Sequence, residues 1–149
     1  DRNQFGLYKF RSMATGSDKA GQITIGNDSR ITKIGKFIRK YKIDELPQLI
    51  NILKGEMSVV GPRPEVKKYV DLYSKEQLTV LSVLPGLSDY ASIEYFDEQT
   101  VLGKAKDPNK EYIEVIMPAK LNLNLKYIAH KSIATDLKII FKTLGKIAK

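Results

Sequence analysis

Hydrophobic residues recur at helical spacing in three segments of the chain. Residues 28–43 and 46–53 each place apolar side chains on one face, and Pro47 and Gly55 suit the first turn and the end of the second helix. Residues 133–147 carry one hydrophobic stripe beside one lysine stripe. We therefore predict three amphipathic helices. Their apolar positions are Ile31, Ile34 and Ile38, then Leu46, Leu49, Ile50 and Leu53, and finally Ile133, Leu137, Ile140, Phe141, Leu144 and Ile147.

Strand-like patterns are shorter. Residues 5–13 (FGLYKFRSM) have the composition of a strand, and residues 57–60 (MSVV) are typical of a buried strand that leads into a rigid Gly-Pro-Arg-Pro turn. Residues 14–29 are rich in loop-forming residues, with one short apolar alternation at Ile23 and Ile25. The strands predict a small sheet.

Local signals mark further helix ends. Ser74 to Gln77 fits a capping box, in which the two side chains hydrogen-bond to each other's backbone. Asp107 and Pro108 suit the cap and first position of another helix, which we expect to end near Pro118. The apolar side of that helix is Tyr112, Val115 and Ile116.

Two later stretches complete the predicted organisation. Pro85 and Gly86 form a strong break, and residues 120–128 (KLNLNLKYI) alternate like a strand although their neighbours are helical, so their structure stays open. The sum is an α+β fold: a single helix-rich domain over residues 1–149 with a small β-sheet.

Composition limits the chemistry that the chain can perform. The 149 residues are 42% hydrophobic and 28% charged, which is ordinary for one globular domain. There is no cysteine and only one histidine, His130, which excludes disulfides, a thiolate metal site, a cysteine nucleophile and a multi-histidine zinc site. Catalysis must use carboxylates, lysine, arginine, hydroxyl groups or a cation bound by oxygen.

Positive charge is concentrated in two places. The formal net charge is +8, residues 30–42 contain six basic side chains and no acid, and residues 131–149 contain five lysines against Asp136. Such patches suit phosphates, nucleic acid or an anionic membrane surface, although a solvated face that aids solubility explains a single patch equally well.

Two adjacent acids, Asp44 and Glu45, follow the basic run at the predicted start of a helix. Neighbouring side chains on a helix point about 100° apart, so the two carboxylates cannot perform the same task. One could attack an electrophile such as phosphorus while the other holds a hard cation, most naturally Mg²⁺. Arg63, in the Pro-flanked turn, offers a planar fork for phosphate oxygens. The simpler interpretation of the two acids is helix capping.

These motifs together closely resemble those of a known family, the bacterial sugar transferases called monotopic phosphoglycosyl transferases. The resemblance covers nearly the whole chain, and its central motif is long and specific. The matching segments are residues 8–13 (YKFRSM), 27–65 (NDSRITKIGKFIRKYKIDELPQLINILKGEMSVVGPRPE), 84–91 (LPGLSDYA) and the tail 127–147 (YIAHKSIATDLKIIFKTLGKI).

The resemblance implies an enzyme that moves a sugar phosphate from a nucleotide diphosphate sugar, usually a UDP-sugar, onto polyprenol phosphate. Asp44 matches the family's nucleophile, which carries the phospho-sugar as a covalent aspartyl intermediate, and Glu45 beside it matches the residue that helps to hold magnesium. The residues that match phosphate-contacting positions are Arg39, Arg63, Lys9 and Arg11. The reaction would be the first membrane step of a bacterial surface glycan pathway.

The resemblance also implies a place in the cell. Family members are monotopic proteins of the cytoplasmic face of the bacterial inner membrane, so the expected partners are the nucleotide sugar, polyprenol phosphate and the membrane surface. The sequence leaves open whether a second copy of the chain is also a partner. The stretch of residues 133–147, with lysines opposite Phe141 and aliphatic residues, suits a membrane interface; packing on the core with the lysines outward is the alternative.

The chain departs from the family pattern in two places. Relatives begin with a basic re-entrant membrane helix, which is not present here, and we expect the chain to be part of a longer protein. No apolar run approaches the ~20 residues that span a bilayer. Many relatives also have an arginine where Leu84 precedes Pro85, and Phe96 stands about where another arginine would be. Sugar and nucleotide preference therefore cannot be transferred from them.

Two other classes of function fit parts of the sequence. A nucleic-acid-binding module would explain the basic balance and the eight tyrosines, but the basic run lacks interleaved aromatic residues and no known motif of that class is present, so we expect no nucleic-acid partner. A non-catalytic interaction domain is the third hypothesis. Only the enzyme hypothesis gives Asp44 a task.

Overall fold

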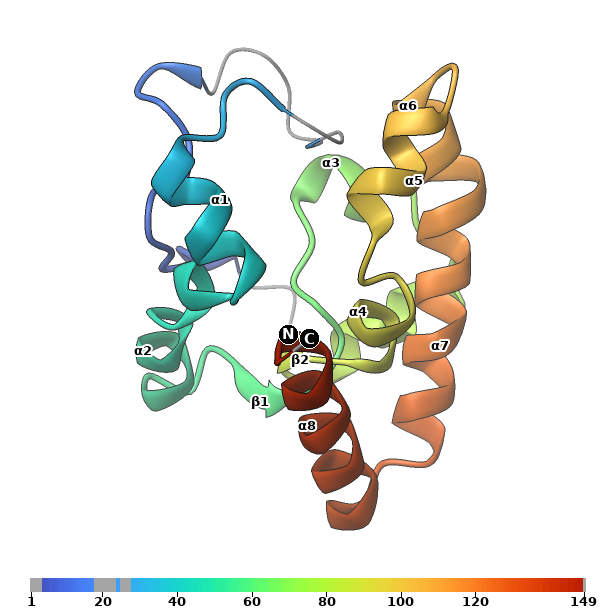
Figure 1. Cartoon of the computed structure of the whole chain (residues 1–149). Helices are drawn as coiled ribbons and strands as arrows, with labels where there is room; N and C mark the ends of the chain where they lie inside the picture. The colour runs from blue at the N-terminus through green and yellow to red at the C-terminus, as the bar shows by residue number, and fades with distance from the viewer. Residues whose placement is uncertain (1–3, 18–23, 25–27, 149) are drawn as a thin grey trace.

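Helices account for most of the protein in a computed structural model that describes residues 4–17, 24 and 28–148 (Figure 1). The helix-rich α+β class predicted from the sequence is confirmed. In chain order the elements are α1 (Lys33–Lys40), η2 (Ile43–Glu45), α2 (Gln48–Leu53), β1 (Ser58–Val60), α3 (Lys67–Val70), η3 (Gln77–Ser82), β2 (Gly86–Ser88), α4 (Tyr90–Glu94), α5 (Glu98–Lys104), α6 (Pro108–Glu111), η4 (Tyr112–Ile116), α7 (Met117–Ala129) and α8 (Ile133–Ile147), where η marks a 3₁₀- or π-helix.

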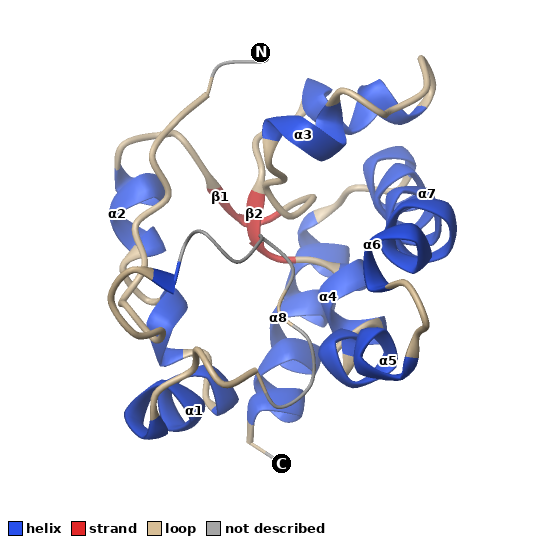
Figure 2. Cartoon of the chain, turned by 90° about the horizontal axis from the view of Figure 1, so that it is seen from above, coloured by secondary structure: helices blue, strands red, loops and turns tan. Residues whose placement is uncertain are grey.

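The sheet within the described residues consists of β1 and β2, which run parallel with Ser58 opposite Gly86 and Val60 opposite Ser88. The strand predicted at residues 57–60 is confirmed. In Figure 2 the two strands lie between α1 and α2 on one side and α5, α6 and α7 on the other. The sheet thus joins two groups of helices that are far apart in the sequence.

Two clusters of buried side chains hold the helices together. The cluster that contains Tyr127 packs α4, α7 and α8 against β1. Tyr127, on α7, also donates a 2.7 Å hydrogen bond from its hydroxyl to Asp136 near the start of α8. The first cluster comprises Tyr69, Val80, Leu102, Tyr112, Ile116, Met117 and Leu121, and the second comprises Val60, Ile93, Tyr127 and Ile139.

Predicted capping signals are confirmed. The backbone N–H of Ser74 donates to Gln77 Oε1 at 2.9 Å, and that of Gln77 donates to Ser74 Oγ at 3.2 Å, which is the reciprocal capping box. Asp107 caps α6 by accepting a bond from the N–H of Lys110, with Pro108 at its first position. Gly55 follows α2 with φ of +75°, a conformation that glycine adopts without steric cost.

The strand predicted at residues 5–13 is wrong. This segment has no regular secondary structure apart from an isolated antiparallel bridge between Met13 and Ile31. Its backbone groups bond to a side chain instead of a neighbouring strand: the buried Asn51 accepts from the N–H of Tyr8 at 3.1 Å and donates to the carbonyl of Gly6 at 2.8 Å. A side chain that supplies both bonds removes the need for a sheet partner.

The prediction that the helix beginning at Pro108 ends near Pro118 is wrong. The helix widens into the π-helix η4 and continues as α7, with Pro118 in the first turn of α7. Proline lacks an N–H, and the wider π-turn ahead of it lets the helix continue without that hydrogen bond. Residues 120–128, which the alternating pattern left open, are therefore helical.

The predicted amphipathic helices form, but much of their apolar surface remains exposed. The polar residues Gln48 and Asn51 are the buried ones of α2, and Ile139 is the buried one of α8. The exposed apolar residues are Ile34, Phe37 and Tyr41 at α1, Leu46, Leu49, Ile50 and Leu53 at α2, and Ile133, Leu137, Phe141 and Leu144 on α8.

Other details of these helices also differ from the prediction. The first helix starts at Lys33 rather than near residue 28, so Ile31 precedes it. Helix α8 packs on the core through Ile139 and Ile140, whereas four of the six residues of its predicted stripe are exposed and Ile140 and Ile147 are half-buried. No helix in the described ranges has the length and apolar content needed to span a membrane. The alternation at Ile23 and Ile25 lies outside the described residues.

Candidate active site

The N-terminal segment is held against the acidic pair by the close approach of two backbones. A β-carbon on Gly35 of α1 would lie 1.9 Å from the carbonyl oxygen of Ser12, so only glycine allows this contact. Farther back in the segment, the N–H of Phe10 donates to the carbonyl of Asp44 at 2.9 Å. These contacts bring the side chain of Lys9 to the acidic pair.

Asp44 and Glu45 lie in the short helix η2, directly before α2, and their exposed fractions are 1% and 6%. Asp44 Oδ2 lies 3.2 Å from Lys9 Nζ. Its other carboxylate oxygen, Oδ1, is buried and has no hydrogen-bond donor among the described residues. A buried carboxylate oxygen without a donor is costly in a folded protein, which points to a group that is completed by something that binds.

Glu45 is surrounded by cations. Arg63 donates to it twice, from Nη2 to Oε1 at 2.5 Å and from Nη1 to Oε2 at 3.2 Å, while Lys9 Nζ lies 3.4 Å from Oε1. Burial acts to raise the pKa of Glu45, but Arg63, Lys42 and Lys9 outweigh it and lower that pKa to about 2. Glu45 is therefore ionised at neutral pH.

Arg63 reaches Glu45 because the chain turns tightly after β1. A β-carbon on Gly86 would lie 2.1 Å from the backbone nitrogen of Gly61, so these two glycines pack directly against each other. Although burial acts to lower it, the negative charge and hydrogen bonds of Glu45 raise the pKa of Arg63. The paired fork geometry fixes the guanidinium at the edge of the cavity described below.

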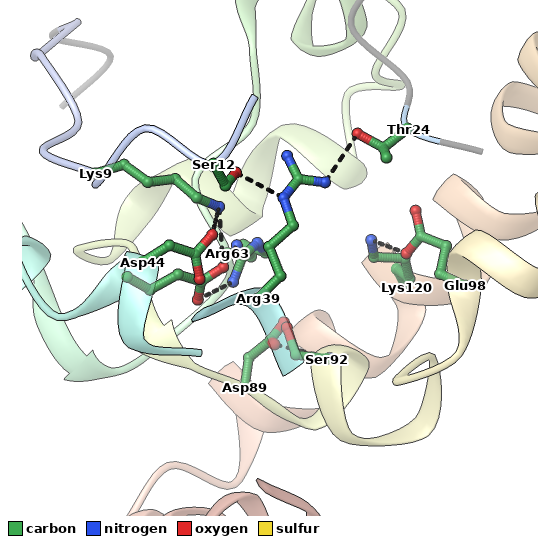
Figure 3. A network of polar contacts seen from close by, with 11 residues as sticks. Lys9, Ser12, Thr24, Arg39, Asp44, Arg63, Asp89, Ser92, Glu98 and Lys120 are labelled. Carbon is green, nitrogen blue, oxygen red and sulfur yellow. Dashed lines mark hydrogen bonds and ion pairs between the residues drawn. The ribbon is translucent and has the colours of Figure 1, made fainter. Parts of the chain in front are cut away.

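Of the five residues predicted to act with Asp44, four line the same cavity as Asp44 and one does not. Arg39 of α1 lines the same cavity as the acids and donates from Nε to Ser12 Oγ at 2.7 Å and from Nη1 to Thr24 Oγ1 at 3.5 Å (Figure 3). Arg11 is exposed and does not line the cavity, so its predicted role stays a prediction. The residues brought together with Asp44 are Lys9, Arg39, Glu45 and Arg63.

This cluster borders a cavity of about 1310 Å³. The far wall comes from α5 and α7, where Lys120 Nζ and Glu98 Oε2 form an ion pair of 2.7 Å, and Figure 3 shows this pair across from Arg39 and the acids. Walls from both groups of helices thus enclose one space in which cations predominate around Asp44 and Glu45. Such a space suits an anionic ligand.

Sequence reasoning missed three features of this site. Lys42 lines the cavity immediately before the acids, and the pair of Glu98 and Lys120 forms the opposite wall. Ser12 is buried and orients Arg39. The place of Lys42 in the basic run was a usable signal, whereas the ion pair joins residues 22 positions apart that only the folded helices bring together.

The magnesium site predicted at the acidic pair can be compared with the residues that the structure places there. Within the described ranges no group of three or more His, Cys, Asp or Glu side chains could hold a metal ion. Mg²⁺ is commonly bound by one or two carboxylates together with substrate phosphates and water, so two acids suffice. The ionised Glu45 and the free Oδ1 of Asp44 fit such an ion, with Arg63 and Lys9 balancing the charge in its absence.

Comparison with known proteins gives a consistent result. The family model described as "Bacterial sugar transferase" matches residues 1–149. A UDP-N-acetylgalactosamine-undecaprenyl-phosphate N-acetylgalactosaminephosphotransferase of Aeromonas hydrophila is 40% identical over 147 residues, which cover 96% of this chain and 32% of that protein. A UDP-glucose:undecaprenyl-phosphate glucose-1-phosphate transferase of Klebsiella pneumoniae is 41% identical, over 94% of this chain and 29% of its own length.

A third relative is shorter. The sugar transferase EpsL of Bacillus subtilis is 37% identical over 143 residues, which cover 96% of this chain and 62% of EpsL. The chain therefore spans about a third of the length of the first two relatives and less than two thirds of the third.

Proposed function

Because the chain belongs to the bacterial sugar transferase family, we propose that it transfers a sugar phosphate from a nucleotide diphosphate sugar, most simply a UDP-sugar, to polyprenol phosphate. Two relatives bear names that specify UDP-sugars as donors and undecaprenyl phosphate as acceptor. The cluster of Lys9, Arg39, Lys42 and Arg63 beside the two carboxylates supports the same reaction class, because phosphoryl transfer depends on positioning and on stabilising negative charge.

The observation that carries this proposal is a buried carboxylate oxygen of Asp44, a residue that lines the cavity, for which the described residues supply no hydrogen-bond donor. This atom, Oδ1, has no donor within the described structure, while Lys9 bonds the other oxygen at 3.2 Å and Arg63 clamps the neighbouring Glu45. A carboxylate used only for capping would direct its oxygens at backbone N–H groups. Asp44 instead leaves Oδ1 without a protein donor, and we propose that a carboxylate oxygen of this side chain acts as the nucleophile once the donor sugar is bound.

The reaction then runs in two displacements at phosphorus. A carboxylate oxygen of Asp44 attacks the phosphorus that carries the sugar, an aspartyl–phosphorus bond forms, and the bond to the bridging oxygen breaks, so nucleoside monophosphate leaves with that electron pair. A phosphate oxygen of polyprenol phosphate next attacks the same phosphorus, and the bond to Asp44 breaks. Polyprenyl diphosphate sugar is released and the carboxylate is restored.

The surrounding residues assist both displacements. Arg63 and Arg39 bind non-bridging phosphate oxygens, and Lys9 balances the charge of Asp44 in its buried place. A magnesium ion held by Glu45, with Asp44 beside it, would supply Lewis-acid stabilisation of charge on the diphosphate. Magnesium in this role is part of the proposal.

The proposal includes a membrane surface, since polyprenol phosphate is a lipid. Three helices expose apolar residues next to lysines, with Phe141 of α8 at 69% exposure and Leu53 of α2 at 88%. Exposed apolar faces of this size mark interaction sites, and flanking lysines favour anionic head groups. We place the protein at the cytoplasmic face of the bacterial inner membrane, in the assembly of a surface glycan.

Mass spectrometry of the full chain after incubation with UDP-sugars and Mg²⁺, without acceptor, tests the proposal. We expect a mass increase equal to one phospho-sugar, located on Asp44 by peptide mapping, together with release of UMP. Chelation of the metal with EDTA should prevent the adduct, and later addition of polyprenol phosphate should remove it.

The matched control is Asp44→Asn, which keeps the size of the side chain and removes the nucleophile. It should give no adduct while its thermal unfolding midpoint stays near that of the unsubstituted chain. An adduct on another residue would remove Asp44 from this role. Formation of the same adduct in EDTA would refute the magnesium requirement, and the absence of any adduct or UMP release would favour a non-catalytic interaction domain.

A further inference from the structure

Lys42 has a backbone conformation that few residues adopt. It lies between α1 and η2 with φ of 54° and ψ of 21°. Among the described residues other than glycine, Lys42 alone has a positive φ. The left-handed region is costly for a side chain with a β-carbon, except that asparagine tolerates it. The conformation is fixed by two hydrogen bonds, from Lys42 N–H to the carbonyl of Arg39 and from Glu45 N–H to the carbonyl of Lys42.

The side chain of Lys42 is half-buried and lines the cavity. Its ammonium nitrogen lies 5.7 Å from the centre of the Phe96 ring, but among the described residues no carboxylate comes within salt-bridge distance of it and no oxygen accepts a hydrogen bond from it. An ammonium group has three donors and strong hydration, so a partly desolvated one without acceptors is incompletely satisfied.

The neighbouring cations are engaged differently. Lys9 contacts both acids and Arg63 contacts Glu45, so the charges of these two cations are largely balanced within the protein. Lys42 adds a positive charge to the same space without a direct ion pair. A bound anion can therefore take the donors of Lys42 without breaking a contact inside the site.

We propose that Lys42 binds the diphosphate group of the nucleotide donor in this cavity, as a contact residue beyond Arg39, Arg63 and Lys9. The inference rests on the proposed function for the identity of the donor. Lys42 lies in the turn that leads into the acidic pair, and its left-handed backbone places its side chain beside the two acids. The Phe96 ring covers one side of the ammonium group and shields that side from water.

Burial and the surrounding charges both act on the ammonium group of Lys42. Burial lowers the pKa of Lys42; the charges of Glu45 and Asp44 oppose that shift, and those of Arg63 and Lys9 add to it. Lys146 Nζ lies 5.9 Å from the centre of the same Phe96 ring and adds further positive charge nearby. The positive charge of Lys42 is thus partly desolvated, and a bound anion would compensate for that cost.

Isothermal titration calorimetry of the full chain with UDP in the presence of Mg²⁺ measures the affinity for UDP. It tests the proposal because UDP binds without turnover. Lys42→Asn and Lys42→Gly remove the ammonium group and suit the left-handed backbone, so both should fold at least as stably as the unsubstituted chain. We expect UDP to bind about 10- to 100-fold more weakly to both, as for the loss of a charged hydrogen bond.

Two further variants separate the contact from general charge. Lys131→Asn removes one positive charge from an exposed residue between α7 and α8 and should leave UDP affinity within about twofold. Lys42→Arg keeps the positive charge and should retain most of the affinity. UDP affinity that is equal in Lys42→Asn and the unsubstituted chain, or UDP binding that is absent from both, would overturn the proposal.

Failure of the Lys42 contact can be distinguished from failure of the proposed transferase reaction. Phospho-sugar on Asp44 with UDP affinity unaffected by Lys42→Asn would refute the contact and leave the reaction standing. UDP binding that depends on Lys42, without any adduct on Asp44, would retain the contact and refute the covalent mechanism.

Discussion

At the scale of single residues, Glu45 couples the site to the stability of the protein. Its pKa is about 2 in the folded chain, below its ordinary value of 4.5, because Arg63, Lys42 and Lys9 outweigh the effect of burial. A lowered folded-state pKa stabilises the protein above the unfolded-state pKa, and that contribution is lost as pH falls from about 5 toward about 2. Glu45→Gln cannot titrate and should lack this dependence.

Urea unfolding of the unsubstituted chain and of Glu45→Gln at pH 6 and at pH 2.5 measures the effect. The difference between their free energies of unfolding should narrow at low pH by up to about 3 kcal/mol. Glu114→Gln, at an exposed position on η4, is the matched control. The difference in free energy of unfolding between this variant and the unsubstituted chain should change little between the two pH values. A difference for Glu45→Gln that stays constant with pH would show that Arg63 does not hold the carboxylate ionised.

At the scale of elements, Gly35 decides whether the N-terminal segment can reach α1. Gly35→Ala would place a methyl group 1.9 Å from the carbonyl oxygen of Ser12, and backbone on both sides leaves little room to yield. We expect a loss of about 1–3 kcal/mol in the free energy of unfolding. Displacement of Ser12 should also disturb Arg39 and so weaken UDP binding.

Gly145 provides the control for this substitution. It lies in α8, and apart from the backbone of its own helix no described atom lies within 4 Å of the place that a β-carbon would take. Gly145→Ala should therefore raise the stability by up to about 1 kcal/mol through helix propensity. Equal effects of the two substitutions in urea unfolding would show that the approach of Ser12 to α1 is not tight.

Elements were predictable from the sequence where a local signal sets them. The capping box of Ser74 and Gln77 and the cap at Asp107 depend on neighbouring residues and are confirmed. The strand prediction for residues 5–13 failed because a distant side chain, Asn51, satisfies their backbone. No local pattern carries that information.

The candidate site divides in the same way. Asp44, Glu45 and Arg63 stand close together in one motif, so their proximity could be proposed from the sequence. The role proposed for Lys42 depends on burial and on a left-handed backbone, which appear only in the folded chain. The ion pair of Glu98 and Lys120 requires two helices to be placed across the cavity.

At the scale of the whole molecule, hydrophobic periodicity identified helices without identifying what they face. The apolar positions of α2 are exposed and its polar Gln48 and Asn51 are buried, which reverses the usual arrangement. Together with α1 and α8, this helix leaves apolar side chains for a surface outside the chain. The formal charge of +8 favours an anionic one.

Binding to lipid vesicles tests this arrangement. Phe141→Glu on α8 and Leu53→Glu on α2 each replace an exposed apolar side chain by a negative charge, and each should lower binding to vesicles that contain anionic lipid by about tenfold or more. Val115→Glu is the matched control, because it makes the same change of charge at an apolar residue that is 53% exposed and lies on η4, outside α1, α2 and α8. Its effect on vesicle binding should be smaller.

Salt and a double substitution separate the contributions of charge and apolar contact to vesicle binding. Raising the salt concentration should weaken the binding of every variant, since the lysines beside the apolar faces act through screened charge. If the apolar faces of α2 and α8 contact the same bilayer, Leu53→Glu and Phe141→Glu together should lower binding by about the product of their separate effects. Binding that Val115→Glu lowers as much as Phe141→Glu would show that charge alone, and not these helix faces, holds the protein at the membrane.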